Sequence, residues 1–156
     1  MSTDPPGYEL PLRLLFGFRV LVDGVHAELA RHGHPELRPV HGFVLQAVGP
    51  SGATAVELGR RLGVSKQAAA KHIEFLQTRG YLERATDPDD ARRRPVRLTE
   101  RGLDSLRRSA AAFDEMRASW GRTLGEQRLR ALEADLRAVT PQAAFRLDLP
   151  GWFAGG

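Results

Sequence analysis

The stretch of residues 54–80 constrains the fold more than any other part of this 156-residue chain. Thr54 and Glu57 stand at the spacing of a capping box, in which a threonine hydroxyl accepts an orphan backbone N–H and a glutamate reaches back to the cap. A helix is therefore expected over about residues 55–62, and Gly63 supplies a turn after it.

A second helix is expected directly after that turn. Ser65 is a favourable N-cap residue and Gly80 suits the left-handed position that follows a helix, so the helix should run over residues 66–79. The apolar residues that would pack between the two helices are Leu58, Leu62, Val64, Ala69, Ile73 and Leu76. With these turned inward, the residues of the second helix left facing outward are Lys66, Gln67, Ala70, Lys71 and Glu74.

The segments on either side predict a mainly helical protein with one small hairpin, which is an α+β fold class. Apolar residues recur at helical spacing over four further stretches, at about 11–31, 39–48, 100–120 and 129–139. The last two are expected to be separated by a break around residues 121–125. Residues 81–84 and 96–98 alternate apolar and polar side chains, as strands do, with a charged loop between them.

Composition and motifs argue against catalysis and against cofactors. The chain has no cysteine, which excludes disulfides, thiolate nucleophiles and zinc sites built on thiolates. No dinucleotide fingerprint, phosphate loop, zinc-protease motif or nucleophile elbow occurs in the sequence. We therefore expect a protein that is not an enzyme and that needs neither a cofactor nor a metal ion.

The sequence gives no sign of a membrane span or an export signal. The longest apolar run, residues 14–18, is far shorter than the roughly 20 residues that a bilayer requires. The first six residues contain neither a basic start nor an apolar signal core. The expectation is a cytoplasmic protein without a membrane partner.

The excess positive charge lies in the middle of the chain. The sequence has a net charge of +4, and residues 54–102 hold eleven Lys or Arg against seven Asp or Glu. Both lysines of the sequence, Lys66 and Lys71, belong to the outward face of the second helix. A helix braced by another can place its N-terminal residues in the major groove of DNA, which is about 12 Å wide. Double-stranded DNA is therefore the expected partner, and the alternative is a helical hairpin with a solvated basic face.

A pattern of three segments follows the second helix. They are Gly80-Tyr81-Leu82-Glu83-Arg84, Asp87-Pro88-Asp89-Asp90-Ala91-Arg92 and Val96-Arg97-Leu98-Thr99-Glu100-Arg101-Gly102. With the helix pair before them, they resemble the MarR family of bacterial winged helix-turn-helix regulators, and the resemblance extends over about residues 10–140. It implies that Asp90 shapes a wing loop and that Arg92 reaches toward the minor groove. Gly59 stands where the family usually has alanine, which should loosen its helix by about 1 kcal/mol.

Helix geometry and the resemblance together give a set of candidate DNA contacts. The residues expected at or near base edges are Ser65, Lys66, Gln67, Ala70 and Lys71. Thr54, Arg84 and Arg93 are expected to contact phosphates, which position a protein without reading sequence. Arg94 fits either role.

The terminal segments are expected to form a helical dimerisation region. It would comprise residues 1–35 and 103–156, around a winged helix-turn-helix domain over residues 36–102. The resemblance implies a homodimer, and these segments hold more apolar surface than one chain of this length could hide. The residues concerned are Tyr8, Leu10, Leu12, Leu129, Leu132, Leu136, Trp152 and Phe153.

The resulting hypothesis is a transcription regulator, more specifically a repressor, that binds a pseudo-palindromic operator as a homodimer. A small aromatic acid or phenol is the expected effector, because apolar walls would bury its ring and a cation or histidine would fix its charged end. The residues that would hold it are His26, His41, Arg117 and Trp120. Two alternatives stay open: a winged-helix protein-interaction module, and a metal sensor that uses the histidines.

Overall fold

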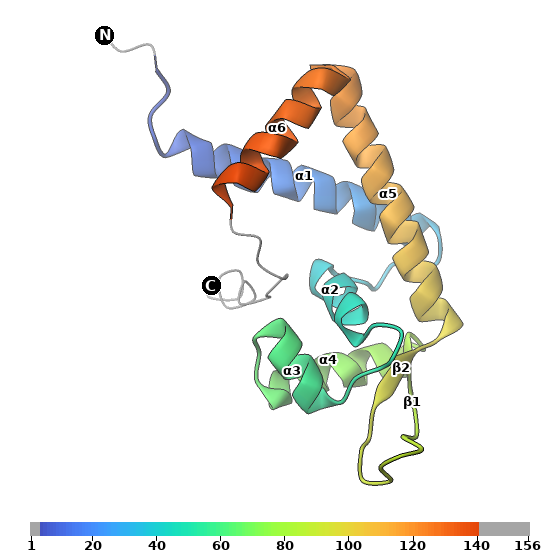
Figure 1. Ribbon diagram of the computed structural model, residues 1–156. Helices are drawn as coiled ribbons and strands as arrows, with labels where there is room; N and C mark the ends of the chain where they lie inside the picture. The colour runs from blue at the N-terminus through green and yellow to red at the C-terminus, as the bar shows by residue number, and fades with distance from the viewer. Residues whose placement is uncertain (1–3, 141–156) are drawn as a thin grey trace.

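The computed structural model describes residues 4–140 of the chain (Figure 1). Its elements, in chain order, are α1 (Glu9–Arg31), α2 (Pro39–Val48), α3 (Ala55–Leu62), α4 (Lys66–Thr78), β1 (Leu82–Arg84), β2 (Val96–Leu98), α5 (Glu100–Leu124) and α6 (Glu126–Val139). Among the described helices none is long and apolar enough to cross a membrane. Trp152 and Phe153, two of the expected dimer contacts, lie outside the described residues.

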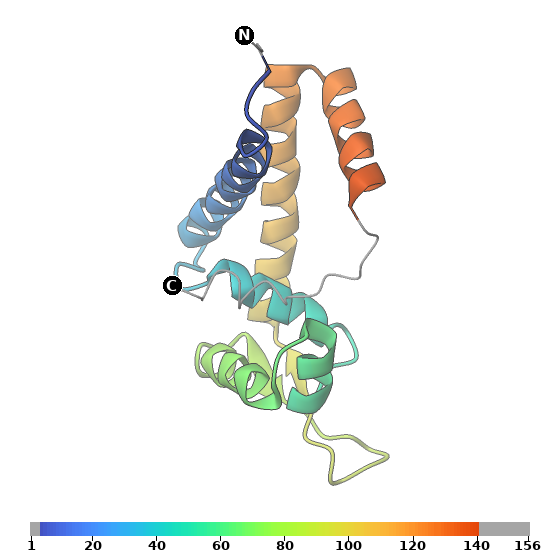
Figure 2. The ribbon, with the colours of Figure 1, turned by 90° about the vertical axis from the view of Figure 1, so that its left-hand side faces the viewer.

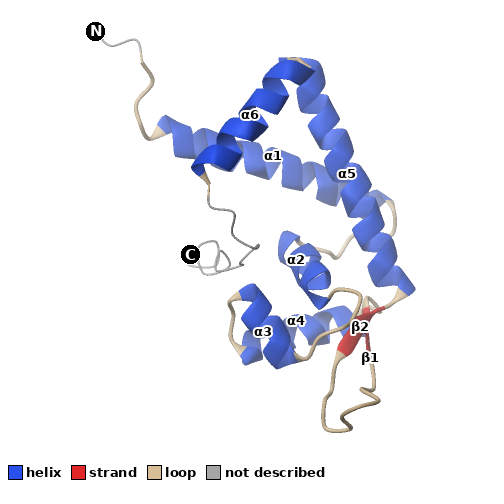
Figure 3. Ribbon diagram, viewed as in Figure 1, coloured by secondary structure: helices blue, strands red, loops and turns tan. Residues whose placement is uncertain are grey.

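The helices divide into two groups at opposite ends of the molecule. Figures 1 and 2 both place α1 and α6 toward one end, and α3, α4 and the hairpin of β1 and β2 at the other. α5 joins the two groups, since it begins beside the hairpin and runs to the far end, packing against α1 on the way. Figure 3 shows how small the strand content is beside the helices, so the mainly α class with a winged helix-turn-helix is confirmed.

One contiguous hydrophobic core holds these elements together, with α2 near its centre. Val44, Leu45 and Val48 of α2 are fully buried members of this core, and α2 contacts α3, α4, α5 and β2. Other fully or nearly fully buried members are Val25, Leu29, Leu58, Leu62 and Leu76. Truncation of one buried leucine of this kind to alanine typically costs about 2 to 5 kcal/mol.

The predicted helix, turn and second helix are confirmed. Gly63 ends α3 in the left-handed conformation, with φ of 69°, which side chains with a Cβ rarely adopt. The capping box also forms, because Thr54 Oγ1 accepts the N–H of Glu57 at 3.2 Å and Glu57 Oε2 accepts the N–H of Thr54 at 3.0 Å. Local capping and turn residues therefore determine where these two helices start and stop.

Gly59, for which the sequence predicted a loosened helix, lies where α3 meets the turn. A Cβ atom at this position would be 2.8 Å from the carbonyl oxygen of Val64, closer than such atoms normally approach. The predicted loosening of this helix followed from helix propensity alone and took no account of contacts with the turn. In this fold the missing side chain allows the turn to pack closely against α3.

Gly59→Ala is therefore expected to lower the free energy of unfolding by about 1 to 3 kcal/mol, because strain against a backbone atom outweighs the gain in helix propensity. Urea denaturation measures the change. Gly42→Ala on α2 is the matched control, since nothing lies within 4 Å of its added Cβ, and we expect it to leave stability unchanged or raise it. A Gly59→Ala protein as stable as the parent would contradict this account.

β1 and β2 pair in antiparallel register, with Leu82 opposite Leu98. The first strand begins one residue later than predicted, because the N–H of Tyr81 bonds to the carbonyl of Leu76 at 2.8 Å and so closes α4. Ala53 adds an isolated bridge to Val96, which brings the segment before α3 against the hairpin. The hairpin is thereby attached to both helices of the helix-turn-helix.

The boundary between α5 and α6 differs from the prediction. α5 continues through Gly121 and ends at Leu124, and the chain turns at Gly125, which has φ of 88°. Gly121 stays helical. A glycine inside the predicted break thus does not by itself end the helix.

Candidate nucleic-acid interface

The first two turns of α4 carry a compact exposed face. Ser65 caps the helix, because its Oγ accepts the N–H of Ala68 at 3.1 Å. The residues predicted at base edges are all exposed there: Ser65, Lys66, Gln67, Ala70 and Lys71. In the described part of the chain neither lysine has an ion-pair partner. The face therefore presents two uncompensated positive charges and one amide.

The wing, defined as residues 85–95 between β1 and β2, extends away from the body of the molecule (Figures 1 and 2). Two aspartates shape it through their own backbone. Asp87 Oδ1 accepts the N–H of Asp89 and Asp90 Oδ1 accepts the N–H of Arg92, both at 2.9 Å. These bonds give the charged loop defined turns in place of a regular strand.

Arg93 ties the wing to α3. Its guanidinium lies 2.6 Å from a carboxylate oxygen of Glu57 and 3.2 Å from one of Asp87. The hydrogen bonds from Arg93 hold the pKa of Glu57 below its usual range, with the N–H of Thr54 adding to the effect. Arg93 was expected at a phosphate, but its positive charge is already engaged by two carboxylates, so the structure gives it an anchoring role in the wing.

The other arginines of the wing and its first strand are not ion-paired as Arg93 is; they are Arg84, Arg92 and Arg94. All three are exposed, and none has an ion-pair partner within the part of the chain that the structure describes. Arg84 belongs to β1, while Arg92 and Arg94 flank the anchored Arg93 in the wing. The wing therefore offers free guanidinium groups on a loop whose position is held by a third arginine.

His26 and His41, two of the four predicted effector residues, lie together between α1, α2 and α4. The ring nitrogen Nδ1 of His26 is 3.0 Å from the carbonyl oxygen of Leu37. His41 is buried, its Nδ1 accepts the N–H of Arg38 at 2.9 Å, and its ring stacks on Phe75 with centroids 4.2 Å apart. Both rings thus have structural contacts within the core of this chain.

The environment of His41 makes folding sensitive to acid. Burial, together with the positive charges of His72 and Arg38, lowers the pKa of His41 from 6.5 to about 4. The unfolded chain therefore binds this proton more readily than the folded protein. The stabilising effect of the neutral ring is complete above about pH 6.5 and is lost as the pH falls toward 4, by roughly 3 kcal/mol.

His41→Gln is expected to flatten the fall in unfolding free energy between about pH 7 and pH 4, because glutamine keeps an acceptor for the Arg38 N–H and does not titrate. Denaturation at a series of pH values measures the slope. His32→Gln is the control, since it removes a histidine whose side chain is 47% exposed and leaves His41 in place. If the unfolding free energy of the parent and of His41→Gln changed equally with pH, His41 would not be the source of the acid sensitivity.

The other two predicted effector residues, Arg117 and Trp120, lie at a different place. They line a cavity of about 340 Å³ between α1, α5 and α6, whose apolar walls include Leu21, Phe113, Leu129, Leu132 and Leu136. Arg117 pairs there with Glu133 at 2.7 Å and with Glu126 at 3.0 Å. The structure thus brings the four residues together as two pairs and not as one site.

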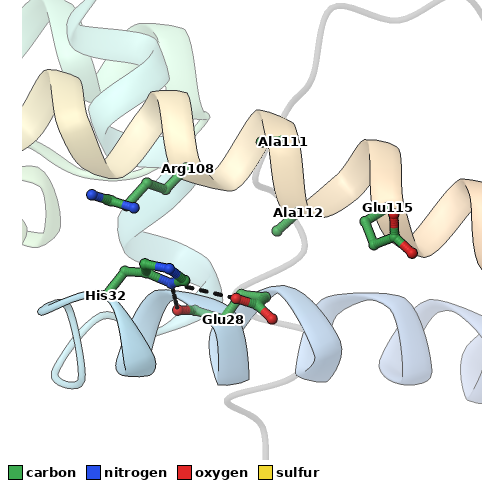
Figure 4. Close-up of a pocket in the computed structure, with 6 residues that line it drawn as sticks. All are labelled: Glu28, His32, Arg108, Ala111, Ala112 and Glu115. Atoms are coloured by element: carbon green, nitrogen blue, oxygen red, sulfur yellow. Dashed lines mark hydrogen bonds and ion pairs between the residues drawn. The ribbon is translucent and has the colours of Figure 1, made fainter.

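A second pocket, of about 310 Å³, opens between α1 and α5 (Figure 4). Ala111 and Ala112 form an apolar part of its lining, and charged groups surround it. Those groups already have partners, since His32 Nδ1 lies 3.3 Å from Glu28 and Arg108 pairs with Asp104. Within residues 4–140, no group of three His, Asp or Glu residues could hold a metal ion.

A polar cluster that sequence reasoning missed lies where the winged part meets α5. His34, only 3% exposed, is hydrogen-bonded to Tyr81 at 2.9 Å and to Asp104 at 2.8 Å. Glu36 and Arg101 complete the cluster. These residues are up to 70 positions apart in the sequence, and no spacing rule connects them.

The helix pair α3–α4, followed by a hairpin with a long projecting loop, defines this protein as a winged helix-turn-helix. Residues 37–93 match the MarR family, which confirms the resemblance over this segment. The LexA repressor of Deinococcus radiodurans is 31% identical over 87 residues, which are 54% of this chain and 39% of the relative. The chain thus spans about two fifths of the length of this curated relative.

Solved structures share the fold over most of the chain. The reduced form of MarR from E. coli covers 90% of this chain and 100% of its own, with a TM-score of 0.69 at 21% identity. FabT from Streptococcus pneumoniae, in complex with DNA, covers 86% of this chain and 94% of its own, with a TM-score of 0.72 at 15% identity. The fold, α1, α5 and α6 included, is therefore shared with MarR and FabT.

Proposed function

We propose that this protein is a DNA-binding transcription regulator, and that it represses genes from a pseudo-palindromic operator. The main support for the proposal is where the chain places lysine and arginine side chains that have no ion-pair partner among the described residues. Lys66 and Lys71 on α4, and Arg92 and Arg94 on the wing, belong to the elements at the end of the molecule away from α1 and α6 (Figure 1). An uncompensated positive surface of this kind attracts the phosphate backbone of a nucleic acid.

Each element has its own part in the proposed complex. The first turns of α4 enter the major groove, where Gln67 and Lys71 read base edges and Ser65, Lys66 and Ala70 lie beside them. Arg92 and Arg94 of the wing reach the flanking minor groove, where narrow A·T stretches concentrate negative potential. Thr54 and Arg84 contact phosphates. FabT, a protein with the same fold, has been solved with DNA bound, which supports this mode of binding.

The protein is proposed to act as a homodimer through residues 1–35 and 103–156, with the winged domain over residues 36–102. Support comes from exposed apolar side chains along the first half of α1, which are unusual on a monomeric surface. These are Tyr8, Leu10, Leu12, Leu14, Phe16, Phe18 and Val20, all at least 41% exposed. Phe113 on α5 and Leu132 on α6 are exposed as well.

An effector is proposed for the cavity beside Arg117 and Trp120. Its apolar walls suit an aromatic ring, and Arg117 suits a carboxylate, which would compete with Glu126 and Glu133 for the guanidinium. An aromatic acid would therefore loosen the contact between α5 and α6. The name of the LexA repressor supports a repressor role, and the protein is proposed to act in the cytoplasm, where it would meet DNA.

Selection of bound duplexes from a random library, using the purified full chain, tests the proposal. We expect an enriched site with two inverted halves whose centres lie about one helical turn apart. Gln67→Ala should relax the preference at one position per half by about 1 to 3 kcal/mol, with Gln77→Ala as the control on the same helix. Failure to enrich any duplex would overturn the proposal and favour a winged-helix module for protein partners.

A further inference from the structure

The end of α4 is bonded directly to the start of α5. The N–H of Thr99, the residue that caps α5, donates to the carbonyl of Tyr81 at 3.1 Å, and its hydroxyl donates to the carbonyl of Gly80 at 2.5 Å. Tyr81 in turn closes α4, since its N–H donates to the carbonyl of Leu76. The helix with the exposed basic face is thus joined to the long helix that runs to the other end of the molecule (Figure 1).

Arg101, in the first turn of α5, adds side-chain contacts at this junction. Its Nε donates to the carbonyl of Arg79, the C-cap of α4, at 3.1 Å. Its Nη2 donates to Oε1 of Glu36, in the connection between α1 and α2, at 2.8 Å. Its guanidinium also lies 4.5 Å from the ring centroid of Tyr81, within the range of a cation–π contact. One side chain of α5 therefore contacts both the end of α4 and the connection between α1 and α2.

Glu36 and Tyr81 give this contact a buried, charged side. Tyr81 is fully buried, and its hydroxyl lies 3.1 Å from Oε1 of Glu36, the oxygen that Arg101 also contacts. Burial acts to raise the pKa of Glu36, but hydrogen bonds with its own backbone N–H, with Arg101 and with Tyr81 outweigh it, so the pKa is lowered. A hydrogen bond from a guanidinium to a carboxylate is roughly twice as strong as one between neutral groups.

His34 makes a second bridge at the same junction. Its ring lies between Tyr81 and Asp104, with Nδ1 2.9 Å from the phenol oxygen and Nε2 2.8 Å from Oδ2 of Asp104 on α5. The residue is only 3% exposed, and Arg108 donates to the same Asp104 oxygen at 2.9 Å. The start of α5 is therefore held against the connection between α1 and α2 by two side chains, Arg101 and His34.

The angle at this junction determines where α4 lies relative to the far end of α5. A helix of 25 residues is about 37 Å long, so a tilt of about 5° at its start displaces its other end by about 3 Å. That displacement is close to the rise of about 3.4 Å between neighbouring base pairs. In the proposed dimer, whose contact surface would lie toward that far end, such a tilt in each copy alters the distance between the two α4 faces by a base-pair step or more.

We propose that Arg101 is a positioning residue that fixes the angle between α4 and α5, and so determines which spacing of two operator half-sites the dimer accepts. The inference rests on the proposed DNA-binding function and homodimer. Without the bonds from Arg101 to Arg79 and Glu36, the winged part adopts a range of angles, and duplexes with incorrect spacing are bound almost as well as the correct one. The base preference of α4 within each half-site is retained.

The first test needs no DNA. Residual dipolar couplings of the backbone N–H groups in the full chain report whether two helices keep one relative orientation. We expect the couplings of α4 and α5 in the parent to fit a single alignment tensor. In Arg101→Gln the tensor fitted to α4 should be smaller in magnitude than the one fitted to α5, because α4 then moves relative to α5. A single tensor that fits both helices in Arg101→Gln would overturn the proposal.

The second test measures affinity for duplexes in which the spacing between the two selected half-sites changes by one base pair at a time. The parent should bind the best spacing about tenfold or more tightly than its neighbours, and Arg101→Gln should reduce this ratio to about threefold or less. A ratio in Arg101→Gln equal to that of the parent would overturn the proposal.

Two further variants separate position from charge. Arg101→Lys keeps the positive charge, but a single ammonium does not reproduce the flat guanidinium that contacts two acceptors, so it should lose the spacing preference as Arg101→Gln does. Arg107→Gln removes an arginine whose side chain is 65% exposed on the same helix and should match the parent. A spacing preference fully kept in Arg101→Lys, or lost equally in Arg107→Gln, would show that charge and not position is responsible.

The outcomes distinguish this proposal from the proposed function. If the parent binds no duplex, DNA binding and the control of spacing both fail, while the dipolar couplings still show whether Arg101 fixes the angle. If the parent prefers one spacing and Arg101→Gln keeps that preference, the function stands and the role of Arg101 does not. A loss of stability alone leaves the ratio unchanged, because unfolding lowers the affinity for every duplex by the same factor. The unfolding transition of each variant establishes that it folds.

Discussion

Replacing both free wing arginines, with Arg92→Ala and Arg94→Ala together, is expected to weaken duplex binding by roughly 100- to 1,000-fold at about 150 mM salt. A dimer would lose four guanidinium groups, and each phosphate contact contributes a slope of about 0.9 in the logarithm of affinity against the logarithm of salt. The slope should therefore fall by about 3 to 4 if all four contact phosphates. Fluorescence anisotropy over a series of salt concentrations measures both quantities.

Two comparison variants make this result specific. Arg93→Ala should weaken binding less and leave the salt slope nearly unchanged, because Arg93 is engaged by Glu57 and Asp87 and serves to hold the wing. Arg107→Ala with Arg122→Ala removes the same charge from exposed positions on α5 and should have little effect. A double wing variant with the affinity and slope of the parent would show that the wing does not contact DNA.

Placing charges on the exposed face of α1 is expected to abolish assembly. Phe16 and Val20 are 52% and 60% exposed and stand one helical turn apart, so Phe16→Glu with Val20→Glu puts two carboxylates in the proposed dimer surface. Burying such charges without partners costs several kcal/mol per ion. We expect a monomer of 17.2 kDa in sedimentation in place of a dimer, and loss of about 100-fold or more in operator affinity.

The matched control is Val56→Glu on α3, an exposed valine of the winged part that should leave the sedimenting mass unchanged. Circular dichroism establishes that the α1 variant still folds. A parent protein that sediments as a monomer and yet binds the selected site specifically would refute the dimer, and so would an α1 variant that remains dimeric.

Local signals in the sequence predicted the helix-turn-helix well. Thr54, Ser65, Gly63 and Gly80 each determine a boundary through a side-chain cap or a left-handed backbone, and such effects involve neighbours in the chain. Exposure of the α4 face followed from the same pattern, because burial of Ala69, Ile73 and Leu76 leaves the opposite side of α4 outward. The parts of the fold that depend on residues close together in the chain could therefore be predicted from the sequence.

Features that depend on contacts between residues far apart in the chain could not be predicted from the sequence. The role of Gly59 depends on where the carbonyl of Val64 lies, and α5 continues through Gly121 to Leu124. Arg93 was grouped with Arg92 and Arg94 as a basic run, although its partner Glu57 is 36 residues away. Only the position of the wing beside α3 shows that Arg93 is ion-paired while its neighbours Arg92 and Arg94 are not.

The candidate effector residues illustrate the same limit. His26, His41, Arg117 and Trp120 share a chemistry that suits an aromatic acid, but sequence spacing does not place α2 relative to the middle of α5. In the structure the two histidines have core contacts, while Arg117 and Trp120 line the cavity between α1, α5 and α6. The bonds of His34 to Tyr81 and Asp104 likewise depend on tertiary packing.

The most direct test of the central claim is the affinity of the full chain for a selected duplex compared with a scrambled duplex of the same composition. We expect the parent to prefer the selected site by at least about 1,000-fold. We also expect Lys66→Ala, Gln67→Ala and Lys71→Ala together to remove most of this preference while the unfolding transition is kept. Equal affinity of the parent for the two duplexes, or full preference in the triple variant, would contradict the claim that α4 reads DNA.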